Sequence, residues 1–477
     1  MKTPTISSVI GKLTAKNSKE LLVRSHLDPT KILHNVACID GKDDSTIDTI
    51  CKTANYGFVE WSARSVQQRA EILGKAAEIL SERKRSFVDA HLEIGGPVWF
   101  ANFNVDGAIG QLKQYIACIL SQQEGQVLQS NATALALTYK RPIGPVLSIA
   151  PWNAPVILGS RSIAAPLAAG CSVVLKSSEK SPLLSFLLVK CFHDAGVPSD
   201  TLQLINVTPD DSPDFTKKML SDDAIRMVNF TGSTAVGRQI AIAAASNLKP
   251  TLLELGGKNC IIVESDADLQ KCVPAILQNS WWHQGQICMS SDKVYVHSDI
   301  YKEFIESCLS LAKKEVESNQ DLKIPLRDKV GSKRVNDLVK DAVSKGATII
   351  FGDYSKEFSN NQISPLILEG VTSSMKIHSE EIFGPVFCVY RYDDINSAVD
   401  EVNSSKLGLK ASVWARDTLK AIGISKKIQC GGVHINRSCV HDEPTVPHGG
   451  IKSSGQGRFN SSWGIDSFSY TQAVTVG

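Results

Sequence analysis

Twelve cysteines occur in this chain of 477 residues, and the surroundings of Cys288 set it apart from the other eleven. It lies in the segment Trp281-Trp282-His283-Gln284-Gly285-Gln286-Ile287-Cys288-Met289, where a glycine interrupts an apolar stretch and a loop presents the thiol. A thiol nucleophile requires a loop or a helix end, limited access of water and a nearby base. Cys288 is therefore a candidate nucleophile, with His283 as a local base. A buried structural cysteine is the alternative.

Glu254 is the candidate general base. It stands in the apolar run Thr251-Leu252-Leu253-Glu254-Leu255, immediately before Gly256 and Gly257. Burial disfavours the charged form of a carboxyl group, so we expect the pKa of Glu254 to be raised. A carboxyl group with a raised pKa suits proton removal near neutral pH. A carboxylate that faces water at a strand end is the alternative.

Two further segments suit a dinucleotide. Lys176 ends an apolar strand and is followed by Glu179, whose carboxylate could accept the two hydroxyls of a ribose. Gly232 and Ser233 stand between a strand and a helix, where backbone N–H groups suit a pyrophosphate. Each pattern also occurs as an ordinary helix cap. The Gly-x-Gly-x-x-Gly fingerprint of dinucleotide folds does not follow the first strands.

The elements that must position these residues alternate between strand and helix. Residues 145–150, 172–176, 202–207 and 226–230 are predicted strands, and 154–169, 181–195 and the residues after 232 are predicted helices. Buried strands that alternate with helices form a parallel sheet covered on both faces. A second α/β unit begins near residue 254, with strands at 261–264 and 293–297 and a helix over 299–317. Upstream of both, residues 59–93 are predicted as one helix.

Two β segments stand outside this alternation. Residues 125–140 predict a hairpin and the tail 467–476 predicts a strand. Each would expose an unpaired edge unless another strand covers it. We expect the two segments to pair across a subunit interface, with pairing inside one chain as the alternative.

Composition excludes several classes of protein. Hydrophobic residues make up 43% and the formal net charge is +2, so neither nucleic acid nor a membrane is an expected partner. No two cysteines form a Cys-x-x-Cys pair, and no metal is expected. The opening segment is polar and lacks an apolar signal sequence. We expect a cytoplasmic protein, with mitochondrial import as the alternative because that segment is acid-poor and rich in Ser and Thr.

Taken in order, the motifs resemble the aldehyde dehydrogenase superfamily over essentially the whole chain. The matching segments are Pro151-Trp152-Asn153, Lys176-Ser177-Ser178-Glu179, Phe230-Thr231-Gly232-Ser233, Leu253-Glu254-Leu255-Gly256-Gly257-Lys258, Gly285-Gln286-Ile287-Cys288, Glu381-Ile382-Phe383-Gly384-Pro385-Val386 and Lys452-Ser453-Ser454-Gly455-Gln456-Gly457-Arg458. Within the superfamily, Val440-His441-Asp442-Glu443-Pro444 and His448-Gly449-Gly450 are similar to the subgroup that oxidises salicylaldehyde, benzaldehyde and vanillin.

The resemblance implies a Rossmann-like parallel-sheet cofactor domain, an α/β catalytic domain and a small β oligomerisation element. We expect the cofactor domain to span residues 1–123 and 142–253 and the catalytic domain to span residues 254–442. The oligomerisation element is expected to comprise residues 124–141 and 460–477. A homodimer or homotetramer is the expected assembly. Cys288 would add to the aldehyde carbon to form a thiohemiacetal, and hydride transfer to the nicotinamide would leave a thioester. Asn153 would complete an oxyanion hole, and Glu254 would activate the water that releases the free acid.

The resemblance also implies how a cofactor and an aldehyde are held. Lys176 and Glu179 would hold the adenosine ribose, and the charge of Glu179 would repel a 2′-phosphate, so we expect NAD with NADP as the alternative. The other cofactor residues would be Trp152, Gly232, Ser233, Val236, Gly256, Glu381 and Phe383. The substrate residues would be Trp99, Ile157, Arg161, Trp282, Ile287 and Met289.

Among the substrate residues, Arg161 lies one helical turn after Ile157 and is expected to contact a ring hydroxyl or phenolate. Trp99 and Trp282 would form an aromatic wall.

Other functions stay open at this point. An aliphatic aldehyde or a semialdehyde is the rival substrate within the enzyme class. A cysteine hydrolase using Cys288 and His283 is a rival reaction that needs no nucleotide. A structural protein on the same fold is a further rival, although it would give no reason to retain Cys288, Glu254 and Asn153 together.

Overall fold

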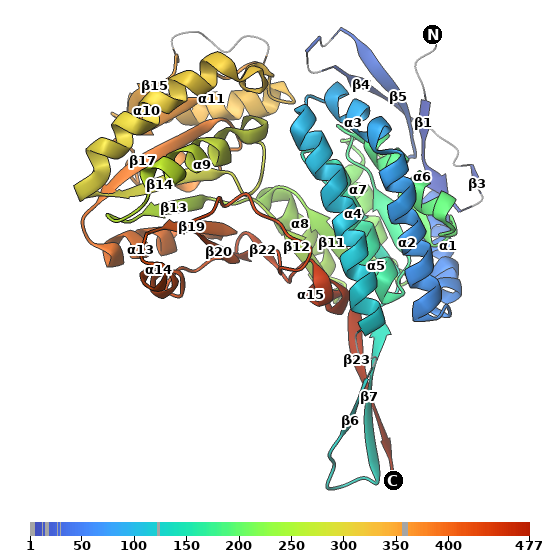
Figure 1. Cartoon of the computed structure of the whole chain (residues 1–477). Helices are drawn as coiled ribbons and strands as arrows, with labels where there is room; N and C mark the ends of the chain where they lie inside the picture. The colour runs from blue at the N-terminus through green and yellow to red at the C-terminus, as the bar shows by residue number, and fades with distance from the viewer. Residues whose placement is uncertain are drawn as a thin grey trace.

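The computed structural model describes residues 5–11, 13–14, 19–25, 27–28, 30–121, 125–354 and 361–477. Two α/β bodies lie side by side, and a narrow β ribbon projects from the first of them (Figure 1). The predicted α/β class with parallel sheets is confirmed. Several of the opening residues on which the expected location rests, 1–4, 12 and 15–18, lie outside the described residues.

The sheet of the first body has a parallel centre. Its neighbouring strands are, in order, β12 (Thr251–Glu254), β11 (Met227–Thr231), β8 (Val146–Ile149), β9 (Val173–Lys176) and β10 (Leu202–Ile205). The short strands β22 (Gly455–Gln456), β2 (Val9–Ile10) and β3 (Leu13–Thr14) extend its two edges. Strand order reverses at β8, since β9 and β10 lie on one side of it and β11 and β12 on the other. Ligands bind at such a switch point, outside the carboxyl ends of the strands.

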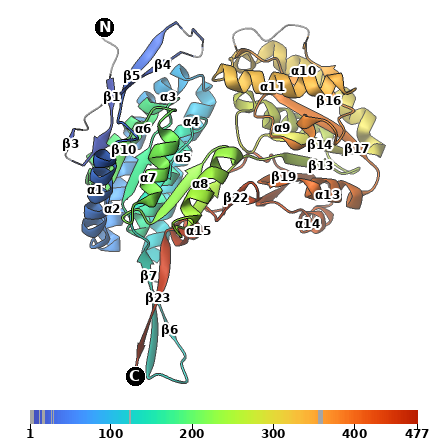
Figure 2. The ribbon, with the colours of Figure 1, turned by 180° about the vertical axis from the view of Figure 1, so that it is seen from behind.

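Helices cover both faces of this sheet, as the alternation of apolar strands and helices predicted. One face packs on α2 (Val66–Glu82), α3 (Lys84–Glu93), α4 (Val98–Ser121), α5 (Pro155–Ala169) and α6 (Pro182–Ala195). The opposite face, turned to the viewer in Figure 2, packs on α1 (Asp44–Ser62), α7 (Ser212–Ser221) and α8 (Thr234–Ala245). The prediction of one helix over 59–93 is wrong. Ser65 and Gln68 form a capping box that starts α2 afresh, and the backbone turns again at Arg83.

The second body is built in the same way. Its sheet runs in the order β15 (Thr348–Phe351), β16 (Leu366–Glu369), β17 (Val386–Tyr392), β14 (Ser291–His297), β13 (Asn259–Val263), β19 (Lys410–Trp414) and β20 (Gly432–Ile435). The helices packed on it are α9 (Leu269–Trp281), α10 (Tyr301–Ser318), α11 (Lys329–Ser344), α13 (Ile395–Ser404) and α14 (Thr418–Ser425). In the described part of this second sheet, β15 is the only strand that runs antiparallel to its neighbour.

The projecting ribbon consists of β6 (Gly125–Leu128), β7 (Leu135–Pro142) and the tail strand β23 (Ser469–Val476). β23 pairs with β7 along its whole length, from Ser469 opposite Pro142 to Val476 opposite Leu135. Our expectation that the hairpin and the tail pair across a subunit interface is therefore wrong. Pairing inside one chain satisfies the edge of β7 and leaves β6 and β23 as the outer edges.

The C-terminal segment returns to the first body before it forms the ribbon. Gly455 of β22 pairs with Glu254 at the end of β12, and α15 (Ser461–Ser467) packs against α4 and α5. This return brings residues near 450 beside β12, which is far away in sequence.

Short elements complete the described chain. They are β1 (Thr5–Ser7), β4 (Lys19–Arg24), β5 (Ile32–Cys38), β18 (Leu407–Gly408), β21 (Ile451–Lys452), α12 (Lys376–Ser379), η1 (Trp282–Gly285), η2 (Ser298–Ile300) and η3 (Gln320–Lys323). In the part of the chain that the structure describes, no helix is long and apolar enough to cross a membrane. The same part holds no cluster of His, Cys, Asp and Glu suited to a metal ion.

Candidate active site

The predicted nucleophile and base lie together where the two bodies meet. Glu254 is the last residue of β12 and its side chain is fully buried. Cys288 follows η1 and stands before β14, so each body contributes one of the pair. Cys288 and Cys430 are half-buried, while the other ten cysteines are buried and all twelve are free. Partial access to the thiol suits a nucleophile.

A sharp turn presents Cys288. His283 and Gln284 have positive φ angles of 49° and 53°, and Gly285 continues the turn with a φ of 69°. A Cβ atom on Gly285 would lie 2.1 Å from the carbonyl oxygen of Gly384, so only glycine allows this approach. The Gly285 that interrupts the sequence pattern therefore sets the course of the loop.

Two asparagines hold the loop in place. The Asn259 side-chain amide donates to the carbonyl oxygens of Cys288, at 2.7 Å, and Ser290, at 2.9 Å. The Asn153 amide donates to the carbonyl oxygen of Gln286 at 3.0 Å, which brings this predicted oxyanion residue beside the nucleophile. The role of Asn259 was not predicted from the sequence, although this residue directly follows the motif that ends at Lys258.

Apolar and aromatic side chains surround Cys288. The rings of Trp99 and Trp282 lie 4.9 Å apart. The cluster that holds them and Cys288 also contains Phe100, Ala154, Ile157, Leu158, Ile287, Met289, Leu409 and Val440. Five of the predicted substrate residues thus lie together beside the thiol. Phe100 and Leu409 are further members that the sequence did not single out, and Val440 belongs to the segment that resembles the aromatic-aldehyde subgroup.

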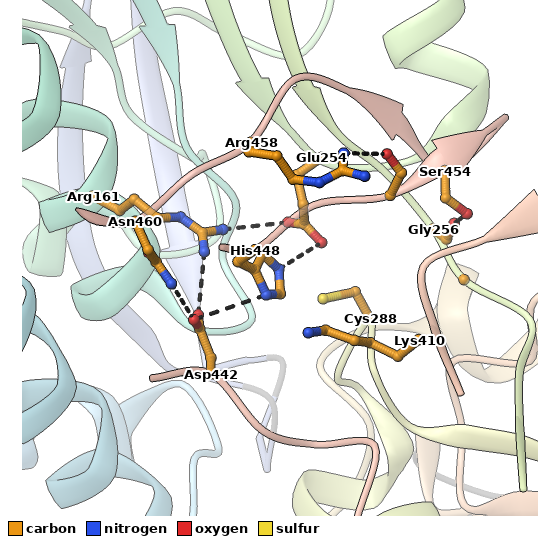
Figure 3. Close-up of polar contacts among 12 residues, drawn as sticks. Arg161, Glu254, Gly256, Cys288, Lys410, Asp442, His448, Ser454, Arg458 and Asn460 are labelled. Carbon is orange, nitrogen blue, oxygen red and sulfur yellow. Dashed lines mark hydrogen bonds and ion pairs between the residues drawn. The ribbon is translucent and has the colours of Figure 1, made fainter. Parts of the chain in front are cut away.

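Ionisable side chains surround Glu254 instead (Figure 3). The Arg161 guanidinium lies 3.6 Å from the Glu254 carboxylate and 3.1 Å from that of Asp442. The His448 imidazole lies 3.7 Å from Glu254 and 3.8 Å from Asp442 on its other side. The Asn460 amide donates to Asp442 at 2.6 Å. We call Arg161, Glu254, Asp442 and His448 the charged cluster.

Arg161, which we expect to contact a ring hydroxyl, has protein partners in the structure. Its side chain is fully buried, its guanidinium carbon lies 4.3 Å from the centre of the Phe459 ring, and two carboxylates flank it. A buried cation needs such partners, and the carboxylates here are those of Glu254 and Asp442. The sequence did not place Asp442, His448 or Asn460 beside Glu254, because each becomes its neighbour only through the return of the C-terminal segment.

The charged cluster also overturns the expected pKa of Glu254. Burial alone would raise it, but the neighbouring His448 and Arg161 side chains outweigh burial and hold the pKa of Glu254 below its usual value. Burial and the neighbouring Glu254 carboxylate raise the pKa of the Cys288 thiol well above its usual value. The carboxylate is thus kept ionised and the free thiol is kept protonated.

His283 does not stand out as the partner of Cys288. Its ring stacks on Phe100, with ring centres 4.5 Å apart, and meets His91 edge-on at 6.3 Å. The charged groups that shift the pKa of Cys288 are Glu254, Glu381 and Arg161. This arrangement favours Glu254 over His283 as the base and weakens the hydrolase alternative.

The predicted cofactor residues lie at the carboxyl ends of the first sheet. Lys176 ends β9 and is buried, and Glu179 is half-buried in the turn before α6. Ser233 is exposed, caps α8 and accepts from the N–H of Val236. A Cβ atom on Gly232 would lie 2.5 Å from the Phe230 ring, so glycine keeps this helix entry open.

A second group of cofactor residues lies nearer to Cys288. The Lys180 ammonium lies 5.2 Å from the centre of the Trp152 ring, which meets the Phe383 ring edge-on at 6.1 Å. The Gly257 N–H donates to the Glu381 carboxylate at 3.1 Å, and a Cβ atom on Gly256 would lie 2.5 Å from that carboxylate. Burial raises the pKa of Glu381 to about 7. An exposed helix N-terminus and a buried lysine at one sheet edge fit a dinucleotide.

Comparison with known proteins identifies the family to which the chain belongs. Residues 18–474 match the profile of the Aldehyde dehydrogenase family. The chain belongs to the aldehyde dehydrogenase family. It is an aldehyde dehydrogenase, an oxidoreductase of a family that uses NAD(P).

Relatives of this aldehyde dehydrogenase include enzymes named for aromatic aldehydes. It is 37% identical to a vanillin dehydrogenase of Pseudomonas fluorescens, over 90% of this chain and 89% of that one. It is 35% identical to a salicylaldehyde dehydrogenase of Pseudomonas sp. (strain C18), over 94% and 98% of the two chains. A crystal structure of the Pseudomonas putida G7 salicylaldehyde dehydrogenase complexed with salicylaldehyde superposes with a TM-score of 0.93 at 32% identity, covering 99% of this chain and 98% of that one.

Proposed function

We propose that this aldehyde dehydrogenase oxidises aromatic aldehydes to carboxylic acids and prefers NAD to NADP. The observation that carries the substrate proposal is the apolar cluster around Cys288, in which Trp99, Trp282 and Phe100 supply aromatic faces. Flat aromatic rings pack favourably against such faces. The names of the vanillin and salicylaldehyde relatives agree with this proposal.

Acylation would begin at the thiol. Because the pKa of Cys288 is raised, a base must take its proton as the sulfur attacks the aldehyde carbon, and Glu254 is the neighbouring carboxylate. The Asn153 amide and the Cys288 N–H would donate to the oxygen that becomes negative. A bound nicotinamide would supply the oxidant by accepting hydride from the Cys288-bound carbon, which leaves a thioester on the sulfur.

Deacylation would use the same carboxylate. Glu254 would first release to solvent the proton that it took from the thiol. It would then remove a proton from water as the water oxygen attacks the thioester carbon. The charged cluster supports this role, since the Arg161 guanidinium beside Glu254 lowers the pKa of the buried carboxyl group. The product would be the free acid.

The proposed preference for NAD rests on charge at the ribose end. Lys176 and Glu179 would hold the adenosine ribose, and Glu179 would repel a 2′-phosphate. Trp152 and Ser233, with Gly232 and Val236 beside them, would face the pyrophosphate. At the other end Gly256, Glu381 and Phe383 would face the nicotinamide ribose and ring.

We also propose a homodimer or homotetramer held through the ribbon. Its outer strands carry exposed apolar side chains, including Val127, Leu128, Tyr470 and Val476. Together with two free strand edges, these side chains offer a surface for a second copy. We also propose that the chain divides into a cofactor domain of residues 1–123 and 142–253, a catalytic domain of residues 254–442, and an oligomerisation element of residues 124–141 and 460–477.

Initial rates test the proposal. Benzaldehyde, vanillin and salicylaldehyde would be compared with butanal, hexanal and succinate semialdehyde, each with NAD and with NADP, by absorbance at 340 nm. We expect kcat/KM to be about tenfold or more higher for the aromatic aldehydes, and for NAD over NADP. Equal or higher kcat/KM for the aliphatic aldehydes would overturn the substrate proposal. A higher value with NADP would overturn the cofactor preference.

A further inference from the structure

His448 lies between two buried carboxylates. Its Nε2 is 3.7 Å from Oε1 of Glu254 and its Nδ1 is 3.8 Å from Oδ1 of Asp442. The three side chains are 2%, 0% and 5% exposed, respectively, so little water reaches them. Each ring nitrogen therefore faces its own acid in a nearly closed space (Figure 3).

The backbone fixes this ring in place. The His448 N–H donates to the carbonyl oxygen of Phe459 at 3.1 Å, and the Phe459 N–H donates back at 2.7 Å. Gly449 continues the turn with a φ of 154°, and a Cβ atom on Gly450 would lie 2.5 Å from Cβ of Ser454. The paired backbone and the tight glycine turn hold the imidazole between the two acids.

The contacts are longer than hydrogen bonds. Among the described residues, neither nitrogen of His448 and neither oxygen of Glu254 has a hydrogen-bond partner. Buried polar atoms without partners are costly, and they often mark groups that acquire partners during a reaction. Catalytic hydrogen bonds are also commonly long in the free enzyme and shorten in the reacting complex.

Other charged and titratable groups face His448 or its two acids from the surrounding elements. They are Arg161 of α5, Lys410 of β19, His434 of β20, Cys288 of the loop between η1 and β14, Tyr115 of α4, His441 and Glu443 beside Asp442, and Arg458 beside Gly449. Arg161 is held by both carboxylates, and a guanidinium does not release its proton in a protein. His448 is the one member of the charged cluster that can take a proton from Glu254 and face a second acid while doing so.

We propose that His448 is a positioning residue of deacylation, which receives through Glu254 the proton taken from the hydrolytic water, with Asp442 facing the charge that results. The inference rests on the proposed function of Cys288 and Glu254.

The step balances in atoms and electrons. The water oxygen bonds to the acyl carbon, and the C–S bond breaks with its electron pair passing to the sulfur of Cys288. One water proton passes to Glu254 and then to Nε2 of His448, which regenerates the carboxylate while Nδ1–H faces Asp442. The acid leaves, and the proton on His448 returns through Glu254 to the thiolate. No oxidant or reductant takes part in this step.

Three variants test the inference. His448→Phe keeps a flat ring without a proton site, and His448→Gln keeps a polar side chain that does not titrate. His441→Phe is the matched control, because His441 is a neighbouring histidine that pairs with Glu443 at 3.0 Å rather than with Glu254. Acyl transfer from 4-nitrophenyl acetate to Cys288 needs no nucleotide, so it isolates deacylation from hydride transfer.

We expect both His448 variants to release one equivalent of nitrophenolate rapidly and then to turn over about ten- to hundredfold more slowly than the wild type. Intact mass should show an acetyl group accumulating on the protein. The fall of the turnover rate on the acid side of the pH–rate profile should move to higher pH. The reason is that loss of His448 removes a group that lowers the pKa of Glu254. His441→Phe should match the wild type in all three readouts.

The inference is overturned if His448→Gln turns over at the wild-type rate and the acid side of its pH–rate profile lies at the same pH as in the wild type. A side chain that does not titrate would then be enough for deacylation. If His448→Phe does not fold, the glutamine variant decides the question alone. Failure of the proposed function has a different signature, namely no reduction of NAD or NADP by the wild type with any aldehyde while the ester is still turned over.

Discussion

The two sides of the site bury their reactive groups in opposite surroundings. Cys288 lies among apolar and aromatic side chains, whereas Glu254 lies among Arg161, His448 and Asp442. Burial favours the neutral form of both groups, yet only the thiol becomes harder to ionise. The pKa of Glu254 falls because cationic partners outweigh the cost of burial.

Burial by itself therefore does not fix the protonation state of a reactive group. The apolar side gives the thiol a dry space in which a ring can pack. The charged side gives the base a carboxylate that stays ionised without water. A single enclosed site thus holds a protonated nucleophile next to an ionised base, which is the arrangement that proton transfer between them requires.

Arg161→Met should have the largest effect, because it removes a cation from the charged side of the site. Methionine keeps much of the volume but leaves Glu254 and Asp442 buried beside each other with one cation fewer. Because breaking a buried ion pair costs about 3–5 kcal/mol, we expect the free energy of unfolding to fall by that amount at pH 7. Urea denaturation measures it. The double variant Arg161→Met with Asp442→Asn should recover part of the loss, and a double variant as unstable as the sum of the two single variants would contradict the coupling.

Glu381 is a half-buried carboxyl group that accepts from the Gly257 N–H, and it offers a contrast with Glu254. Its pKa is raised from 4.5 to about 7 by burial, against the lowering charge of Arg334. The folded state therefore holds a proton that the unfolded state releases, and stability falls as the pH rises from 4.5 to about 7. Glu381→Gln should match the wild type at pH 4.5 and be more stable by about 2 kcal/mol at pH 8. Thermal unfolding at the two pH values checks this, and equal differences at both would contradict it.

Trp99→Leu tests the apolar side and has the smallest expected effect. It removes the ring that packs at 4.9 Å from Trp282 but keeps the site apolar. Aromatic pairs contribute about 0.5–1.5 kcal/mol beyond area burial, so kcat/KM for benzaldehyde should fall about two- to tenfold relative to hexanal. Tyr56→Leu, an exposed aromatic position on α1, is the matched control. An equal fall for both aldehydes would show that Trp99 acts on folding rather than on ring recognition.

The sequence predicted the parts of the site that local pattern encodes. Three features of the site are local: Glu254 stands at a strand end before two glycines, Gly285 interrupts an apolar stretch, and Cys288 lies in a loop. The structure brings Glu254 and Cys288 together. Strands of the first sheet were predicted because each is a continuous apolar run. The division of 59–93 was missed because the capping pair Ser65 and Gln68 is a weak signal inside an amphipathic stretch.

The charged cluster could not be predicted, because it depends on contacts between distant segments. Arg161 and Asp442 are 281 residues apart and meet at 3.1 Å only after the C-terminal segment returns to the first body. Helical spacing alone left the direction of Arg161 open. The expected pKa of Glu254 was wrong for the same reason, since the sequence shows apolar neighbours and hides the cations that arrive from elsewhere.

A single turnover of Glu254→Gln with benzaldehyde and NAD, followed by rapid quenching and intact mass measurement, tests the role of Glu254 as the base. We expect Glu254→Gln to acylate more slowly than the wild type, because the thiol also lacks its base, to release at most one equivalent of NADH and to keep one benzoyl group at Cys288. Steady turnover should fall about 10²- to 10³-fold, because the thioester then lacks its base. Turnover at the wild-type rate without a trapped acyl group would contradict the account.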